Sequence, residues 1–165
     1  MALRRNVLGV VRLGRIGIHI VVGVATIWSR FGRMDYEARN RAVERWAGQF
    51  LRHAGIELQV IGPVPAGGPL LLVANHISWL DIPVIHASQH CRFVSKSDVK
   101  AWPVIGGLAS AAGTLFIERN SRRDAMRMVT RMEQAIRQGH MVAIFPEGTT
   151  GDGSELLPLP ANLLS

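Results

Sequence analysis

A short apolar run at residues 70–74 constrains the fold most strongly, because turn-forming residues bound it on both sides. Such a run is typical of a strand whose two faces are both buried in a sheet. Further strands are predicted at residues 56–61, 92–95, 114–117 and 141–145. Strands that alternate with helical segments predict an α/β domain in which helices cover the sheet.

Two amphipathic helices are predicted from apolar residues that recur at helical spacing. One covers residues 36–53, with Gly55 as its stop, and presents Val43, Trp46, Ala47, Phe50 and Leu51 on one face. The other begins at the cap Ser121 and ends at Gly139, with an apolar stripe formed by Ala125, Met128, Val129, Met132, Ala135 and Ile136. Residues 62–68, rich in glycine and proline, predict a loop.

The N-terminal segment joins an uncharged run at residues 16–28 to a shorter apolar stretch at residues 7–11, with Arg12 and Arg15 between them. A bilayer-spanning helix needs about 20 apolar residues, so this run is short for a span. The interior arginines and the lack of a cleavage site argue against a signal peptide. We expect an interfacial or shallowly inserted helix, with a buried core helix as the alternative.

The domain organisation follows from these segments. Residues 1–33 form the expected membrane-associating segment, and residues 34–165 a single domain built on a mostly buried, mixed sheet. A chain of 165 residues is long enough to bury a core without disulfides or a structural metal.

Charge and composition narrow the class of partner. The chain carries 19 Lys+Arg against 12 Asp+Glu, a net charge of +7, while 48% of its residues are hydrophobic. Apolar and basic character together predict an anionic membrane surface as partner. The arginines are scattered and no nucleic-acid-binding motif is present, so a nucleic-acid partner is not expected.

Cysteine and histidine usage predicts neither a disulfide framework nor a metal. The lone Cys91 has no internal partner, which suits a reducing compartment. His86, His90 and Cys91 are close in sequence, yet no further ligand cluster completes a zinc site. No base is placed beside Cys91 by the sequence, and no serine-hydrolase motif occurs.

His76 and Asp81 follow the strand at residues 70–74 at the point where the chain must turn. On an ideal helix, residues five apart lie about 140° apart, so these side chains meet only if His76 lies on the turn before the helix. A carboxylate there would fix the imidazole tautomer and leave the other nitrogen to accept a proton. Alternatively, residues 78–81 match a capping box, which would give Asp81 a structural role.

Two further segments end predicted strands with polar groups. Residues 113–119 run from Gly113 through Phe116 to Arg119, whose guanidinium suits bidentate phosphate binding or is simply solvated. Phe-Pro-Glu-Gly-Thr at residues 145–149 predicts a tight turn that presents Glu147, Gly148 and Thr149, for ligand binding or as a plain loop.

In this order the three segments resemble the conserved blocks of the glycerolipid acyltransferases, the family that includes bacterial 1-acylglycerol-3-phosphate acyltransferases. The first is His, four residues, Asp; the second is Gly-x-x-Phe-Ile-x-Arg; the third is Phe-Pro-Glu-Gly-Thr. The resemblance extends over residues 70–164, with intervening matches at Phe93 with Lys96 and at Pro103 before Gly106 and Gly107.

The resemblance implies a site and a reaction. His76 would deprotonate an acceptor hydroxyl and Asp81 would orient it, so that the oxygen attacks an acyl thioester. Arg119 would bind the acceptor's phosphate in a pocket shaped by Gly113, Phe116, Glu147, Gly148 and Thr149. The acyl chain would lie near residues 102–112.

The implied partners are a lysophospholipid acceptor, an anionic membrane lipid, and acyl-CoA or acyl-carrier protein as co-substrate, with no cofactor. The implied location is the cytosolic face of the inner membrane.

The sequence departs from the family pattern near its end. Thr150-Gly151 replaces the polar residue usual after the third block, the pair at residues 159–160 is atypical, and Ser165 precedes the family's fourth block. A C-terminally incomplete acyltransferase domain is therefore expected. The alternatives are an inactive, truncated membrane-binding fragment and an acyltransferase that acts on lyso-ornithine lipid.

Overall fold

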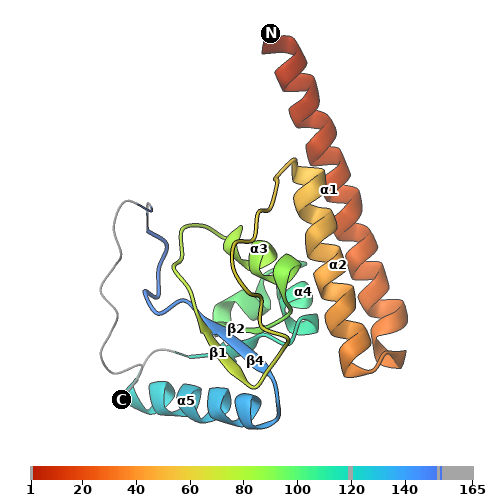
Figure 1. Ribbon diagram of the computed structural model, residues 1–165. Coiled ribbons are helices and arrows are strands. Elements are labelled where there is room, and N and C mark those ends of the chain that lie inside the picture. Colours follow the sequence, from red (N-terminus) through yellow and green to blue (C-terminus); the bar gives the residue numbers. More distant parts are fainter. Residues whose placement is uncertain (1, 119–120, 152, 154–165) are drawn as a thin grey trace.

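The computed structural model describes residues 2–118, 121–151 and 153. Its elements, in chain order, are α1 (Ala2–Arg30), η1 (Phe31–Arg33), α2 (Tyr36–Ala54), β1 (Leu70–Val73), α3 (Asp81–Ser88), β2 (Arg92–Lys96), η2 (Ser97–Ala101), α4 (Ile105–Ala111), β3 (Leu115–Ile117), α5 (Arg122–Arg137) and β4 (Met141–Ile144). Figure 1 shows α1 and α2 as a helical hairpin beside an α/β body. The predicted α/β class with an N-terminal helix is confirmed.

The sheet has the strand order β1-β4-β2-β3. All its pairings are parallel, with Leu72 of β1 opposite Ala143 of β4 and Phe93 of β2 opposite the same residue. The predicted mixed sheet is thus wrong for the described strands. A helix lies between each pair of successive strands, and such a crossover returns the chain to the same end of the sheet, which makes neighbours parallel.

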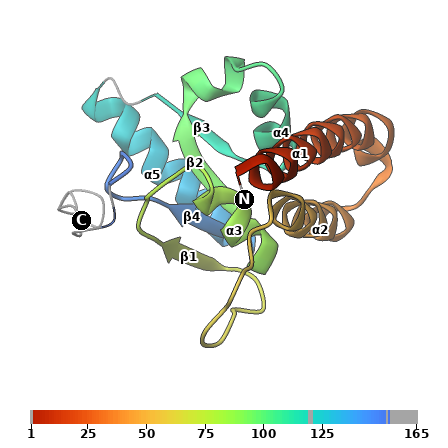
Figure 2. The same cartoon turned by 90° about the horizontal axis from the view of Figure 1, so that it is seen from above.

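Helices cover both faces of this sheet, as Figure 2 shows with α5 on one side and α3 on the other. Alternate residues of β4 face the two helical layers. Val142 and Ile144 pack with the residues of α5, whereas Met141 and Ala143 pack toward Ile85 of α3. All four residues of β4 are buried. The continuous apolar pattern of this strand therefore reflects burial on both faces.

The two predicted amphipathic helices form, with refined boundaries. Helix α2 is capped by Asp35, whose carboxylate accepts the Ala38 N–H at 2.7 Å, and it ends at Gly55 with φ of 74°. Helix α5 starts after Ser121, whose hydroxyl accepts the Asp124 N–H at 3.2 Å. Its buried stripe is narrower than predicted, because Ala125 and Val129 are exposed.

The strand predicted at residues 56–61 does not form. This segment runs as a loop from α2, and neither Val60 nor Ile61 is buried, with exposures of 50% and 88%. An alternating sequence stabilises a strand only when one of its faces is covered. Because these apolar side chains remain outside the core, the alternating pattern of residues 56–61 does not produce a strand.

Helix α1 is longer than the apolar run predicts and passes without a break through Arg12 and Arg15. Within the segment Asn6–Arg33, an 18-residue stretch has a mean hydropathy of 1.8, so the helix is long and apolar enough, by length and composition, to cross a membrane. Only 11% of that stretch is buried. The alternative of a buried core helix is therefore wrong for the described residues.

Helix α1 is held to α2 by a reciprocal pair of side chains. The imidazole Nε2 of His19 lies 2.9 Å from the carbonyl oxygen of Trp46, and the Trp46 indole N–H donates to the His19 carbonyl oxygen at 3.3 Å. The rings also stack with centroids 5.0 Å apart. Gly23 lies directly against the indole, where a side chain would have no room.

Candidate active site

The carboxyl ends of parallel strands lie at one edge of the sheet, and polar residues that follow several strands gather at this edge. Asn75 and His76 follow β1, Glu147 follows β4, Lys96 ends β2 and Glu118 follows β3. Strand β4 is last in the chain but lies between β1 and β2. The third block is thereby brought beside the first, although some 70 residues separate them.

His76 and Asp81 are in direct contact. The imidazole Nδ1 lies 2.9 Å from Asp81 Oδ2, and the side chains are 19% and 25% exposed. Asp81 is the first residue of α3, and His76 lies on the turn before it, which is the arrangement that the five-residue spacing requires. The segment of residues 76–81, which carries the candidate catalytic pair, is called the catalytic turn below.

The capping alternative for Asp81 also holds in part. Asp81 Oδ2 accepts the backbone N–H groups of Ser78 at 3.0 Å and Ile77 at 2.8 Å, so the carboxylate reaches back as in a capping box. The reciprocal half is absent among the described contacts, because the Ser78 hydroxyl accepts the Leu80 N–H at 3.0 Å. One carboxylate oxygen thus both orders the turn and contacts the imidazole.

These contacts set the ionisation of Asp81. Burial alone would raise its pKa, but hydrogen bonds from the Ser78 N–H, the His76 ring and the Ile77 N–H outweigh burial and lower the pKa. The carboxylate is therefore ionised at neutral pH, which favours an Nδ1–H that points toward it. Nε2 of His76 is then the nitrogen with a free lone pair.

The imidazole of His76 is also held on one face. The Phe145 ring stacks on it with centroids 4.0 Å apart and an interplanar angle of 13°. Phe93 of β2 stacks behind Phe145 at 5.5 Å. The sequence predicted Phe145 at the end of a strand but did not predict this contact. The rings of His76, Phe145 and Phe93 come together because β4 lies between β1 and β2.

Glu147 contacts the catalytic turn directly. Its carboxylate accepts the Asn75 side-chain N–H at 3.0 Å and the His76 backbone N–H at 3.3 Å. The Gly151 N–H donates to the His76 carbonyl oxygen at 2.8 Å, so a second contact joins the two segments. The structure therefore places Glu147 on the turn's backbone, while Gly148 and Thr149 are exposed beside it.

Gly148 makes the tight turn that the sequence predicted. Its φ of 70° lies in the left-handed region, and its N–H donates to the Phe145 carbonyl oxygen at 3.1 Å. This turn reverses the chain directly after β4 and so directs Glu147 back toward β1.

The second block is only partly gathered at this edge. Gly113 precedes β3 at the opposite, amino-terminal edge, with φ of 80° and Arg92 beside it. Phe116 lies within β3. Arg119 lies outside the described residues, as do residues 159–160.

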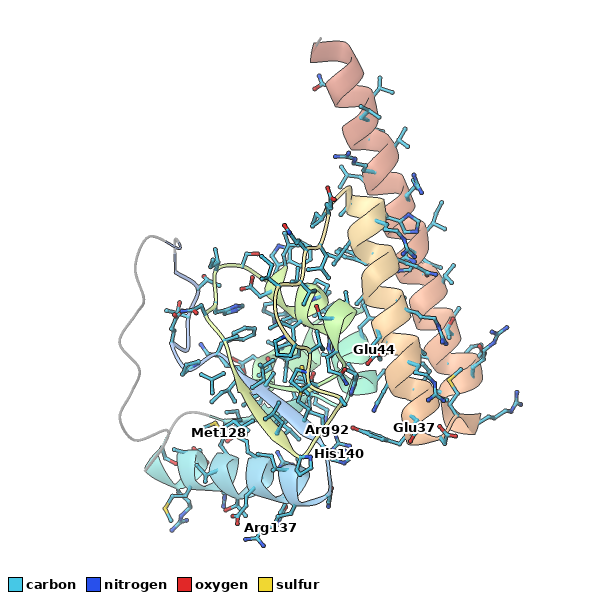
Figure 3. The ribbon with its side chains drawn as sticks, in the orientation of Figure 1. Glu37, Glu44, Arg92, Met128, Arg137 and His140 are labelled. Carbon is cyan, nitrogen blue, oxygen red and sulfur yellow. The ribbon has the colours of Figure 1, made fainter. Side chains whose placement is uncertain are left out.

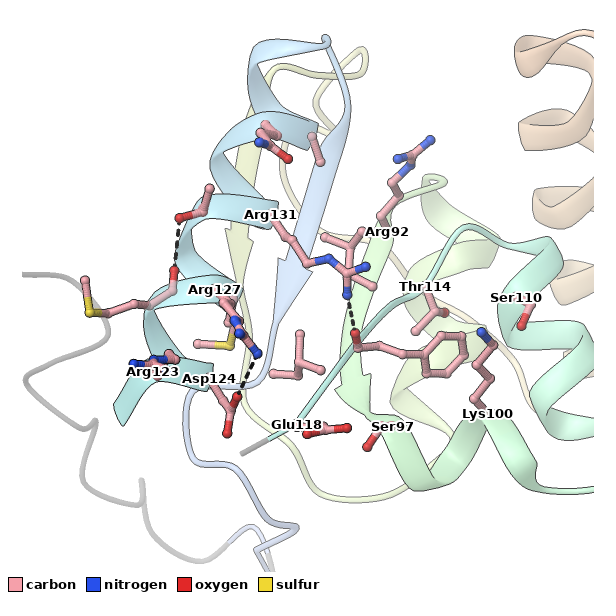
Figure 4. Close-up of a pocket in the computed structure, with 18 of the residues that line it drawn as sticks. Arg92, Ser97, Lys100, Ser110, Thr114, Glu118, Arg123, Asp124, Arg127 and Arg131 are labelled. Carbon is pink, nitrogen blue, oxygen red and sulfur yellow. Dashed lines mark hydrogen bonds and ion pairs between the residues drawn. The ribbon is translucent and has the colours of Figure 1, made fainter. Parts of the chain in front are cut away.

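A large open cavity of about 1360 Å³ runs along β3, between η2 and α5. Figure 4 shows Arg123, Arg127 and Arg131 on its α5 side and Lys100 on its η2 side. Arg131 donates to the Phe116 carbonyl oxygen at 2.7 Å, on the edge of β3 that faces α5. Among the described residues that line the cavity, Ser97 and Glu118 follow the carboxyl ends of β2 and β3, and none belongs to residues 76–81.

A smaller cavity of about 330 Å³ lies between α1 and Val104, and Val104 is its one lining residue from residues 102–112, the region expected to hold an acyl chain. Its lining is apolar and comprises Ile20, Val21, Val24, Ala25, Trp28 and Val104. Val104 has φ of 65°, which is rare for a β-branched residue.

The cysteine and the paired histidines lie on the buried side of α3. Burial raises the pKa of Cys91 to about 12, so its thiol is not ionised at neutral pH. Burial, aided by His90, lowers the pKa of His86 to about 3, and the two rings stack at 5.4 Å. Within the described part of the chain, no three His, Cys, Asp or Glu side chains are grouped to hold a metal ion.

The fold and the site together define a parallel α/β domain with an imidazole–carboxylate pair at the carboxyl edge of its sheet and an apolar helix beside it. The sequence pattern of the acyltransferase family matches residues 55–165, and the chain belongs to this family.

Curated relatives agree with this membership. The chain is 41% identical over 128 residues to a 1-acyl-sn-glycerol-3-phosphate acyltransferase of Neisseria meningitidis, a match that covers 77% of the chain and 50% of the relative. It is 37% identical over 130 residues to a lyso-ornithine lipid O-acyltransferase of Rhizobium meliloti, covering 79% and 44%. The chain thus spans about half the length of these relatives.

The fold also matches a solved structure. The crystal structure of the 1-acyl-sn-glycerophosphate acyltransferase from Thermotoga maritima superposes with a TM-score of 0.77 at 22% identity. The match covers 99% of this chain and 68% of the solved one, and it supports the fold.

Proposed function

We propose that the protein transfers an acyl group from an acyl thioester to the free hydroxyl of a lysolipid. The 2.9 Å contact between His76 Nδ1 and Asp81 Oδ2 carries the proposal, because it leaves Nε2 of a partly exposed imidazole to act as a general base. Family membership supports this chemistry, since the relatives are named as acyltransferases of lyso-ornithine lipid and of 1-acyl-sn-glycerol 3-phosphate.

In the proposed reaction, Nε2 of His76 takes the proton of the acceptor hydroxyl as its oxygen attacks the thioester carbonyl carbon. The C–O ester bond forms, the C–S bond breaks, and the leaving thiolate takes the proton from the imidazolium, which restores the neutral imidazole. Asp81 stabilises that imidazolium and fixes the ring's tautomer. The donor is acyl-CoA or acyl-carrier protein, and no covalent acyl-enzyme is required.

The acceptor's head group lies at the carboxyl edge of the sheet in this proposal. Thr149 offers a hydroxyl beside the catalytic turn, the exposed Gly148 has no side chain to block the ligand, and Arg119 supplies the guanidinium for a phosphate. Because Glu147 already accepts two N–H groups from Asn75 and His76, its proposed role is to hold the catalytic turn. The acyl chain would occupy the apolar cavity between α1 and Val104.

We propose that α1 holds the protein at the cytosolic face of an anionic membrane. The outward face of α1 is apolar, with exposures of 68% at Ile18, 67% at Val21 and 91% at Trp28. The net charge of +7 attracts anionic lipid, with Arg12 and Arg15 within the helix itself. A lysolipid acceptor would then be reached within the same bilayer.

Two acceptor classes follow from the relatives: 1-acyl-sn-glycerol 3-phosphate and lyso-ornithine lipid. The test is to mix purified protein with detergent, acyl-CoA or acyl-carrier protein and each acceptor in turn, and to follow thiol release. Release that depends on a lysolipid acceptor is expected. Failure with every acceptor and both donors would contradict the proposed activity and would favour a membrane-binding protein without catalysis.

A further inference from the structure

Two large apolar side chains of the catalytic turn are more than half exposed. Ile77 is 54% exposed and Trp79 is 64% exposed, although both lie between His76 and Asp81. Their backbone positions are fixed, because the Ile77 N–H binds Asp81 and Trp79 accepts a helical hydrogen bond from Ile82 at 3.4 Å. A rigid turn thus presents apolar groups beside the imidazole.

A row of aromatic rings links Trp79 to the hairpin of α1 and α2. Trp79 lies edge-to-face on Phe50 of α2 at 6.0 Å, and Phe50 stacks on Trp46 at 5.7 Å. Trp46 in turn stacks on His19 of α1 at 5.0 Å. The catalytic turn is therefore braced against the helices whose outer surface is apolar.

Positive charge gathers at the same end of the hairpin. The Arg12 guanidinium lies against Gly55 at the end of α2, one turn beyond Leu51. Arg15 and Arg52 are close enough to His53 that, after burial, they help to lower its pKa. This end of α2 also carries the negative pole of the helix dipole, and three guanidinium groups more than offset it.

We propose that the catalytic turn itself enters the membrane interface, with Ile77 and Trp79 among the acyl chains and Arg12, Arg15 and Arg52 on anionic head groups. This inference rests on the proposed lysolipid substrate. Tryptophan favours the interface because its ring is apolar and its N–H remains hydrogen-bonded. Three residues span about 11 Å at most, so this anchor keeps His76 close to head-group depth, where a lysolipid carries its hydroxyl.

The test places an environment-sensitive NBD label at position 77 through Ile77→Cys in the full chain. Thr130→Cys, on the exposed outer side of α5 at the other face of the sheet, is the matched control. Cys91 is 1% exposed and does not compete for the label. The vesicles contain equal parts of phosphatidylglycerol and phosphatidylcholine, with brominated chains in a second set.

The label at position 77 is expected to shift to shorter wavelength on vesicle addition and to be quenched by brominated chains, while the label at position 130 does neither. A label at position 77 that stays aqueous on vesicle-bound protein overturns the inference, as does one already in an apolar setting before vesicles are added, since another surface then covers it. Absence of vesicle binding by the parent chain overturns the inference as well.

A second measurement is independent of the label. Trp79→Ala is expected to weaken binding to the same vesicles roughly tenfold, and Trp79→Tyr to restore most of it. Trp102→Ala, at another exposed tryptophan, is the matched control and changes binding less. Equal effects at both positions overturn the inference. Acyl transfer is assayed separately. If the protein shows no acyl transfer but the label at position 77 still shifts, the proposed function is refuted and the membrane contact of the turn stands.

Discussion

Asp81 contacts His76 through the same carboxylate oxygen that accepts the backbone N–H groups of Ile77 and Ser78. The oxygen that fixes the turn therefore also fixes the imidazole. From the sequence, capping of the turn and orientation of the imidazole were two alternative roles for Asp81. In the structure, one oxygen atom of Asp81 has both roles. Substitutions that keep its shape but change its charge can separate them.

Asp81→Asn is expected to lower kcat by roughly 10²-fold or more, because the neutral amide no longer stabilises the imidazolium. Its amide oxygen still accepts the turn N–H groups, so stability changes little. Asp81→Ala removes that acceptor as well and is expected to cost about 1 kcal/mol of unfolding free energy in addition. Enzyme kinetics and urea denaturation on both variants check this, and equal stability of the two would contradict the capping role.

Glu147→Gln tests whether this carboxylate positions the turn. Gln offers one oxygen where Glu offers two, so either Asn75 or His76 loses its acceptor. We expect kcat to fall at least tenfold with little change in KM. Glu133→Gln, an exposed i,i+4 partner of Arg137, is the matched control and leaves both constants unchanged. A rise in KM alone would instead place Glu147 in acceptor binding.

Phe145→Leu removes the ring that stacks on His76 while keeping an apolar side chain. Aromatic pairs contribute about 0.5–1.5 kcal/mol beyond area burial, so a loss of several-fold in kcat is expected. Phe93→Leu, which changes the ring behind Phe145 without touching His76, should reduce activity less at similar stability cost. Equal losses of activity would show that core packing, and not the His76 contact, is responsible.

The buried His86 predicts a pH-dependent stability. Its pKa is about 3 in the folded state against 6.5 unfolded, so below pH 6.5 the unfolded chain binds a proton that the folded chain does not. Stability contributed by the neutral ring is therefore complete above pH 6.5 and is lost as pH falls toward 3. His86→Phe should reduce the slope by up to about 1.4 kcal/mol per pH unit, measured by denaturation between pH 6.5 and 5. An unchanged slope would contradict neutral burial.

Gly23→Leu tests the docking of α1 on α2, since a side chain at Gly23 would displace the Trp46 indole. We expect the cross-helix contacts with His19 to be lost, and the contribution of Trp46 to the tryptophan emission to shift to longer wavelength as its indole becomes exposed. Gly17→Leu, where α1 has open space, is the control. An unchanged emission spectrum would contradict this packing.

Local patterns in the sequence were sufficient for the α/β class, for α2 and α5, and for the requirement that His76 lie on a turn. Pairing of distant strands was not, because parallel register depends on which strands become neighbours and no local signal specifies this. That missing step accounts for the wrong mixed sheet and for the unforeseen ring contact between Phe145 and His76. It also accounts for Glu147, because the N–H donors of Asn75 and His76 come near its carboxylate only when β4 lies beside β1.

The strand predicted at residues 56–61 failed for a related reason. Alternating apolar and polar residues predict a strand reliably only where the core covers one face of the strand. In the described structure, no neighbouring strand pairs with residues 56–61. Helix α1 shows the converse: the arginines that suggested an interruption lie on exposed positions of one continuous helix, where their charge costs little.

The rate of acyl transfer by His76→Ala decides whether His76 is the general base. Figure 3 shows His140 near Arg92, at the amino-terminal edge of the sheet, and His140→Gln is the matched histidine control. Thiol release that depends on a lysolipid acceptor should fall by about 10²–10⁴-fold in His76→Ala and stay near the parent value in the control. Undiminished release by a folded His76→Ala protein would contradict the assignment of His76 as the base.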